Sequence, residues 1–133
     1  MMSATSKARL AQAHPSLILL FEKVAETVDI VVLEAHRELE QEAQNIAKGV
    51  SHLKDPMNCL HCRSPSLAVD AAATPVDWND TEAFNRFALD VVKPAADELG
   101  IKVRWGGAWN DIEGWTLNPP HSFNDLDHFE LVT

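Results

Sequence analysis

Four polar residues of this chain are of types that can bind a metal ion and take part in metal-assisted hydrolysis. His61 lies in a segment rich in proline and serine, and Asp70 interrupts the otherwise apolar run Leu67–Ala73. Asp125 and His128 lie close to the C-terminus. A carboxylate inside an apolar strand must be paired or coordinated, because an isolated charge is costly to bury. Two histidines and one carboxylate are a common protein ligand set of catalytic zinc, which keeps its fourth position open for water.

Each of these residues also has a simpler interpretation. A histidine near a strand is often a hydrogen-bonded surface residue, and an aspartate at a strand end is often a cap or half of an ion pair. Asp125 precedes His128 by three residues, so its carboxylate could take a proton from a water beside the metal. Spacing alone leaves both the metal site and the solvated side chains open.

Helices and strands alternate along the segments that must position these residues. Apolar periodicity, β-branched runs and capping signals define the predicted elements. The predicted helices are Pro15–Val28, Arg37–Lys48 and a third that starts in "NDTEAF", is kinked at Pro94 and ends at Gly100; the predicted strands are Asp29–Ala35, Leu67–Ala73, Ile101–Trp105 and "HFELV" at 128–132. Residues 50–66 are predicted to form a long loop. This order predicts an α+β fold, a small antiparallel sheet with flanking helices, in a single domain spanning residues 1–133.

Composition excludes several other classes of protein. The chain has 20 acidic and 11 basic residues, a net charge of −9, which disfavours nucleic acid as a partner. Its longest apolar stretch, Leu17–Phe21, is too short to insert across a membrane. The N-terminal segment lacks the pattern of a secretory signal peptide. We therefore expect a monomer that folds in a cytoplasm.

Cys59 and Cys62 form a C-x-x-C pair around His61. A zinc knuckle needs a second ligand pair at similar spacing, which the sequence does not contain. A redox motif of the thioredoxin type would follow a strand and open a helix, but this pair lies in a predicted loop rich in proline and serine. The pair is therefore predicted to be two reduced thiols, with a redox or ligand role as the alternative.

Three longer motifs resemble a known family. They are "HCRSPSLAVDAAATPVDWNDTEAF", "LGIKVRWGGAWND" and "FNDLDHFEL". Together they resemble the phage endolysin branch of the VanY-like zinc peptidases, which includes L-alanyl-D-glutamate endopeptidases and D-Ala-D-Ala carboxypeptidases of the hedgehog/DD-peptidase fold. The resemblance extends from about His36 to the C-terminus.

The resemblance implies a role for each matching residue. His61, Asp70 and His128 correspond to the ligands of a Zn²⁺ cofactor, and Asp125 corresponds to the catalytic base. Arg37 corresponds to a catalytic arginine that steadies a substrate carboxylate or the developing oxyanion. The implied activity is hydrolysis of the L-Ala–D-Glu bond in the stem peptide of bacterial peptidoglycan. Such an endolysin waits in the host cytoplasm and reaches the cell wall after holin-type release, causing cytolysis.

The chain departs from the family pattern at a few positions. Cys59 replaces a usual serine, and Ala108 replaces the acid of "G-G-D-W", with Asp111 nearby. The glutamine that follows the arginine falls at Gln41, one residue early, or at Gln44.

Several assignments keep a rival. His52 is the alternative first zinc ligand, and His121 is expected to be a loop residue. His14 and His36 are expected to be structural or solvated. Trp105 and Trp109 are expected either in the core or along a substrate groove, and Glu130 either behind a ligand or in solvent. The rival activities are a D-Ala-D-Ala carboxypeptidase of the same fold and a non-catalytic wall-binding or phage structural module.

Overall fold

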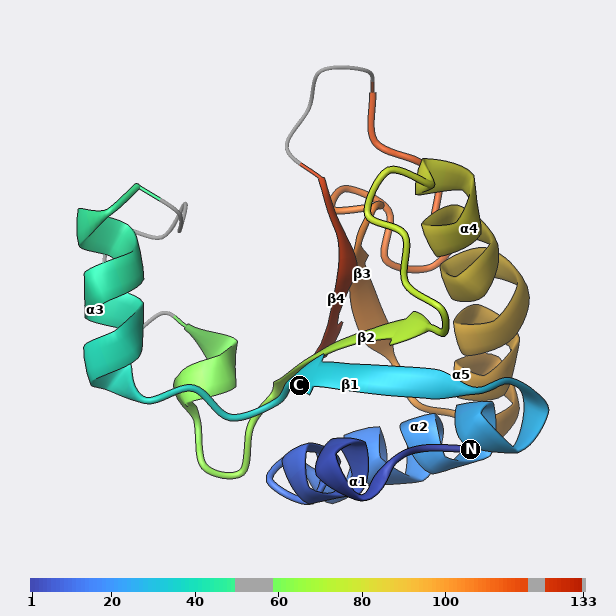
Figure 1. The fold of residues 1–133 in the computed structure, drawn as a ribbon. Helices are drawn as coiled ribbons and strands as arrows, with labels where there is room; N and C mark the ends of the chain where they lie inside the picture. The colour runs from blue at the N-terminus through green and yellow to red at the C-terminus, as the bar shows by residue number, and fades with distance from the viewer. Residues whose placement is uncertain (50–58, 120–123, 133) are drawn as a thin grey trace.

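A four-stranded antiparallel sheet forms the centre of the computed structural model, which describes residues 1–49, 59–119 and 124–132 (Figure 1). The strands are β1 Ile30–Glu34, β2 Ala68–Ala73, β3 Val103–Gly106 and β4 Asp125–Leu131. Their order across the sheet is β1-β2-β4-β3, and every neighbouring pair is antiparallel. The predicted α+β fold with a small antiparallel sheet is confirmed.

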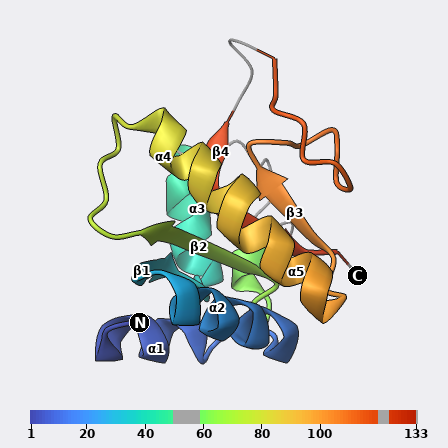
Figure 2. The ribbon, with the colours of Figure 1, turned by 90° about the vertical axis from the view of Figure 1, so that its right-hand side faces the viewer.

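Helices lie on both sides of this sheet. They are α1 Ala4–Leu10, α2 Pro15–Thr27, α3 Leu39–Ala47, α4 Thr81–Arg86 and α5 Lys93–Leu99, with the 3₁₀ turn η2 Leu60–Cys62 and the π-helical segment η3 Phe87–Val92. Figure 2 shows α4 to α5 as one continuous run in front of the sheet, with α3 behind it. None of the described helices is both long and apolar enough to cross a membrane.

The described elements agree with most of the expected ones, and the main differences are the following. Helix α1 was not expected, because its apolar positions are too few to give a periodic signal. Helix α3 begins at Leu39, because Glu38 is extended and takes the N-cap position. The last strand begins at Asp125, three residues before the predicted start. The π-helical segment ends at Val92, two residues before Pro94, which has no backbone N–H to donate and lies in the first turn of α5.

The alternation of side chains along β2 and β4 separates the core from the polar residues. Val69 pairs with Phe129, and Asp70 pairs with His128. Because successive side chains of a strand point to opposite faces, Val69 and Phe129 face the helices, and both are completely buried. Asp70 and His128 therefore face the other side of the sheet, toward η2 and α3.

Phe129 joins the sheet to its helical cover. Its ring centroid lies 5.6 Å from that of Phe21 on α2 and 6.1 Å from that of Phe87 on η3, both edge-on. Trp115 adds a third aromatic contact at 6.1 Å. This packing holds β4 in place, and with it the polar residues on the opposite face.

We predict that Phe129→Ala lowers the free energy of unfolding by about 3–5 kcal/mol, because it leaves a cavity between the sheet and two helical segments. Urea denaturation followed by circular dichroism measures this change. Leu19→Ala is the matched control, because Leu19 is 52% exposed and its truncation should change stability by no more than about 0.5 kcal/mol. Equal losses in the two variants would contradict this account of the core.

Candidate metal centre

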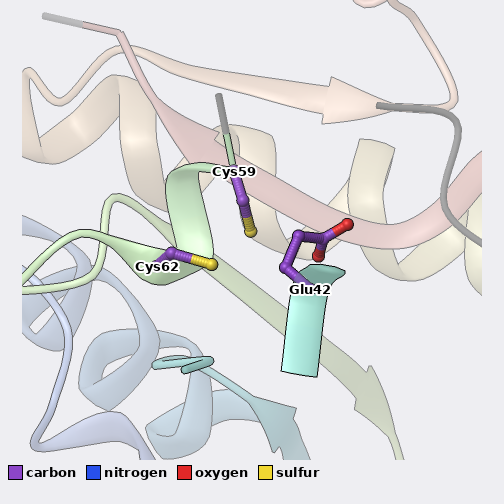
Figure 3. A group of neighbouring side chains, drawn as sticks. All are labelled: Glu42, Cys59 and Cys62. Atoms are coloured by element: carbon purple, nitrogen blue, oxygen red, sulfur yellow. The ribbon is translucent and has the colours of Figure 1, made fainter. Parts of the chain in front are cut away.

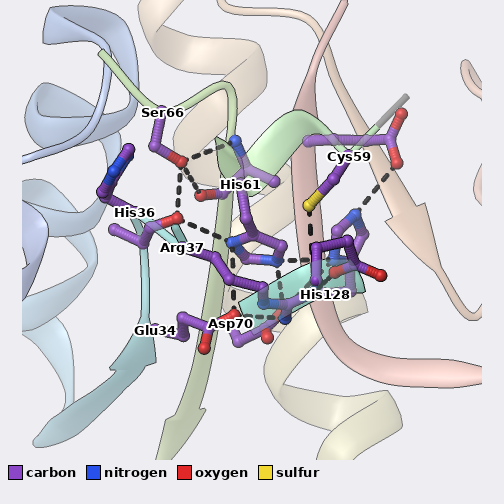
Figure 4. Close-up of polar contacts among 12 residues, drawn as sticks. Glu34, His36, Arg37, Cys59, His61, Ser66, Asp70 and His128 are labelled. Carbon is purple, nitrogen blue, oxygen red and sulfur yellow. Dashed lines mark hydrogen bonds and ion pairs between the residues drawn. The ribbon is translucent and has the colours of Figure 1, made fainter. Parts of the chain in front are cut away.

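His61, Asp70 and His128 come from three elements and meet on the polar face of the sheet (Figure 4). His61 lies in η2, Asp70 on β2 and His128 on β4. His61 Nε2 lies 3.3 Å from His128 Nδ1 and 3.3 Å from Asp70 Oδ1. His128 Nδ1 lies 3.1 Å from the same Asp70 oxygen. The three atoms thus form a nearly equilateral triangle from residues that are far apart in the sequence.

A hydrogen bond on the side of His61 that faces away from the triangle determines which ring nitrogen faces the triangle. His61 Nδ1 lies 2.7 Å from the carbonyl oxygen of Ala35. A carbonyl oxygen only accepts hydrogen bonds, so Nδ1 carries the proton and donates it. In the neutral ring, Nε2 then presents a lone pair to the triangle. Ser66 Oγ lies 2.6 Å from the same carbonyl oxygen and helps to hold it.

His128 is oriented in the same manner with the two nitrogens reversed. Its Nε2 lies 2.9 Å from Glu130 Oε1, and a carboxylate also accepts only, so Nε2 donates. Nδ1 of the neutral ring then faces the triangle. Glu130 is two residues further along β4 and shares its face with His128, so the interpretation of Glu130 as a partner behind a ligand agrees with the structure. Metal-binding histidines usually make such an outer hydrogen bond.

The triangle fits a tetrahedral metal ion. Two imidazole lone pairs and a carboxylate oxygen converge, and no proton lies among them when both rings are neutral. For ligand bonds of about 2.0–2.1 Å, the ligand atoms of a tetrahedral zinc lie roughly 3.3–3.4 Å apart. The observed separations of 3.1–3.3 Å are close to this value. Both histidines are buried, so the cation that balances these lone pairs would be largely shielded from water.

The electrostatics of the pocket favour positive charge. Burial raises the pKa of the Asp70 carboxyl, but its contacts with His128 and His61 outweigh burial and hold that pKa far below its usual value. Burial lowers the pKa of His128, but Asp70, Glu130 and Asp125 more than compensate and raise it to about 10. A metal that binds here must displace protons, because histidine binds metals in its neutral form.

A further carboxylate stands beside the triangle. Asp125 Oδ2 lies 3.7 Å from His128 Nδ1, and its side chain is 37% exposed. The structure therefore places Asp125 next to the three ligand atoms and in reach of solvent. Burial raises the pKa of the neighbouring Asp127 to about 8, together with the charge of Asp70 and a contact with Asp125.

Arg37 is held by two carboxylates, neither of which was identified by the sequence analysis. It forms ion pairs with Glu34 at the end of β1 and with Glu42 on α3. Glu42 is completely buried. The expected glutamine was assigned to Gln41 or Gln44, but Gln41 is exposed and bonds to Asn45. On α3, the side chain that reaches Arg37 is that of Glu42. The helical repeat could have identified Glu42 only if the orientation of α3 relative to Arg37 had been known.

The other candidate residues divide between the core, the surface and the site. Trp105 is completely buried and donates its indole N–H to the carbonyl of Leu126, so its core interpretation is confirmed. The ring of Trp109 lies 5.6 Å from that of His128, at the site. Ala108 is buried in the core. Asp111 does not replace the missing acid, because it accepts from the backbone of Gly114 and Thr116 in its own turn.

The remaining histidines lie away from the triangle. His14 caps α2 by accepting from the backbone N–H of Ser16. His36 contacts the carbonyl of Arg63 and the carboxylate of Glu38. His52, the rival first ligand, and His121 lie outside the described residues.

Comparison with known proteins identifies the class. A family model described as phage L-alanyl-D-glutamate peptidase matches residues 1–132. The chain is 35% identical to the L-alanyl-D-glutamate peptidase of Escherichia phage T5, over 96% of this chain and 94% of that protein. The crystal structure of the Serratia marcescens L-Ala D-Glu endopeptidase ChiX matches with a TM-score of 0.76 and 26% identity, over 99% of this chain and 90% of that chain. The chain belongs to the phage L-alanyl-D-glutamate peptidase family.

We predict that the purified protein binds one equivalent of metal at the triangle and that His61→Ala abolishes this binding, because two of three ligands cannot complete the site. Elemental analysis after gel filtration measures it in the Cys59→Ser, Cys62→Ser background, where the two thiols cannot hold a metal of their own. His52→Ala is the control and should keep one full equivalent. Metal retained by His61→Ala and lost from His52→Ala would transfer the first ligand to His52.

Proposed function

We propose that this protein is a zinc-dependent peptidase that hydrolyses the L-Ala–D-Glu bond in the stem peptide of bacterial peptidoglycan. The observation that supports it most is the convergence of three ligand atoms beside the carboxylate of Asp125. Family membership and the names of both relatives support the choice of bond. We also propose that the enzyme is made in the host cytoplasm and reaches the cell wall after holin-type release.

In this proposal His61, Asp70 and His128 hold the zinc. Their outer hydrogen bonds to Ala35 and Glu130 keep both rings in the tautomers that ligation requires. When bound, zinc polarises the scissile carbonyl and lowers the pKa of water. Asp70 supplies the negative charge that makes the set selective for a divalent cation over a neutral ligand.

Asp125 is the proposed general base. Its carboxylate lies beside the ligand atoms and in contact with solvent, so it can accept a proton from the attacking water. The same carboxyl group then donates that proton to the leaving amine of the D-glutamyl residue, which returns Asp125 to its charged state. Trp109 flanks His128 and is placed to limit the access of bulk water to this side.

Arg37 is proposed to bind a carboxylate of the substrate or to stabilise the oxyanion. Its guanidinium is mostly buried and is oriented by Glu34 and Glu42. Burial alone would lower the pKa of Arg37, but the hydrogen bonds to these two acids outweigh burial and hold that pKa above its usual value. The guanidinium therefore stays charged. The D-glutamyl residue after the scissile bond carries one free carboxylate that such a charge can recognise.

We predict that the protein cuts purified peptidoglycan so that L-Ala stays attached to the muramic acid of the glycan strand, while peptides with a new D-Glu amino terminus are released. Mass spectrometry of the digested muropeptides identifies the bond. Release of a terminal D-Ala would instead support the D-Ala-D-Ala carboxypeptidase, and an unchanged muropeptide profile would support a non-catalytic wall-binding or phage structural module.

We predict that Asp125→Asn keeps its metal but lowers the rate of wall hydrolysis by about 10²–10⁴-fold, because an amide cannot accept the proton. Turbidity loss of permeabilised Gram-negative cells measures the rate, and elemental analysis measures the metal. Asp111→Asn is the control, because Asp111 serves its own turn, and it should lyse at nearly the original rate. An Asp125→Asn variant of full activity would place the base elsewhere, with Asp127 the next residue to test.

A further inference from the structure

A second group of ligand atoms lies next to the first. Cys59, Cys62 and Glu42 bring two sulfurs and a carboxylate oxygen within 4.8 Å of one another (Figure 3). The sequence showed only the C-x-x-C pair and no second pair of ligands. The third ligand comes from α3, because the fold places this helix against the turn that carries the cysteines.

The turn η2 sets the arrangement of the two sulfurs. Cys59 takes its N-cap position and Cys62 is its last residue, and the Cys62 N–H donates to the Cys59 carbonyl at 3.1 Å. Figure 3 shows both side chains directed toward Glu42. Cys59 is 2% exposed and Glu42 is completely buried, whereas Cys62 is half-buried and gives access from solvent. Two thiols spaced C-x-x-C commonly chelate one metal ion.

The charges around this cluster favour a cation. One guanidinium, that of Arg37, is paired with two carboxylates, those of Glu34 and Glu42, so these three side chains carry a net charge of one negative unit. This excess negative charge attracts a cation to the cluster and repels an anion. A buried carboxylate that faces two sulfurs is the mixed ligand set of a thiophilic divalent ion.

We propose that Cys59, Cys62 and Glu42 form a second metal site that binds a thiophilic divalent ion of the zinc and cadmium class, separate from His61, Asp70 and His128. The ion replaces the two thiol protons: two S–H bonds break, two metal–sulfur bonds form and two protons leave for solvent. The net charge of the cluster does not change, since two protons exchange for one divalent ion. No change of oxidation state is involved.

Arg37 competes with this ion. Its Nη1 pairs with the Glu42 carboxylate and lies 3.8 Å from Cys59 Sγ, so it occupies the space between two of the three ligands. An ion at the second site must displace Arg37 from both and leave it paired with Glu34 alone. On the proposed function, where Arg37 contacts substrate, a filled second site lowers peptidase activity. The binding itself does not depend on that function.

A cadmium titration tests the second site without any activity assay. The reduced protein is first loaded with one equivalent of zinc, and Cd²⁺ is then added while the ultraviolet sulfur-to-cadmium charge-transfer band is followed. We expect the band to saturate at one equivalent of cadmium with the zinc retained. The isosteric double variant Cys59→Ser, Cys62→Ser should keep its zinc and show no band.

Three further variants identify the other participants. Glu42→Gln should weaken cadmium binding by at least the roughly 10- to 100-fold that follows loss of a partner behind a ligand. Glu38→Gln is its matched control, because Glu38 is exposed one turn earlier, and it should bind as the parent does. Arg37→Leu should bind cadmium more tightly, because the competing cation is gone and leucine adds no ligand atom.

Three results would overturn the site. The first is the absence of a charge-transfer band in the folded, reduced protein. The second is unchanged cadmium affinity in Glu42→Gln, which would remove the carboxylate from the ligand set. The third is release of zinc in step with the band, which would make the cysteines part of the first site. Circular dichroism confirms folding, and if Glu42→Gln unfolds, the double serine variant and Arg37→Leu decide the outcome.

Discussion

Three lone pairs that face one another in a buried pocket constrain the rest of this structure. Hydrogen bonds on the far sides of His61 and His128 prevent either ring from turning its protonated nitrogen inward. Without a cation or a proton between them, the two imidazole lone pairs and the carboxylate oxygen of Asp70 would repel one another in a medium of low dielectric. The pocket can therefore be stable only with positive charge at its centre. The same arrangement gives the site its chemistry and makes its folding dependent on what it binds.

The fold maintains this pocket through the register of two strands. Asp70 and His128 are paired across β2 and β4, and a slip of one residue would send both side chains into the core. Val69 and Phe129 oppose such a slip, because it would turn both apolar side chains from the helices to the polar face. The apolar face of the sheet thus specifies the polar face. Hydrophobic packing on one side fixes the positions of charged groups on the other without any direct contact between the two.

The sequence could predict what depends on local pattern. Apolar periodicity located α2 and the alternation of "LAVDAA" located β2, because both signals arise within one element. Family motifs brought His61, Asp70 and His128 together, although spacing alone did not. Glu42 and α1 were missed for a different reason. Glu42 matters only because α3 packs beside η2, and that is a tertiary contact with no periodic trace in the sequence. The start of β4 at Asp125 was also missed, because Asp125 and Asp127 are rare strand residues that the site, rather than propensity, holds in place.

The turn η2 connects the two metal-type clusters through three residues. His61 points from its centre to the triangle, while Cys59 and Cys62 at its ends point to Glu42. The backbone N–H of Arg37 donates to the carbonyl of His61 at 2.8 Å, so the segment that carries the arginine is bound to the same turn. A change in the conformation of η2 would therefore move a ligand of the first cluster and the guanidinium together. Cys59 begins this turn and its sulfur lies 3.8 Å from Arg37 Nη1, so binding of an ion at Cys59 would act on the turn and on the guanidinium together.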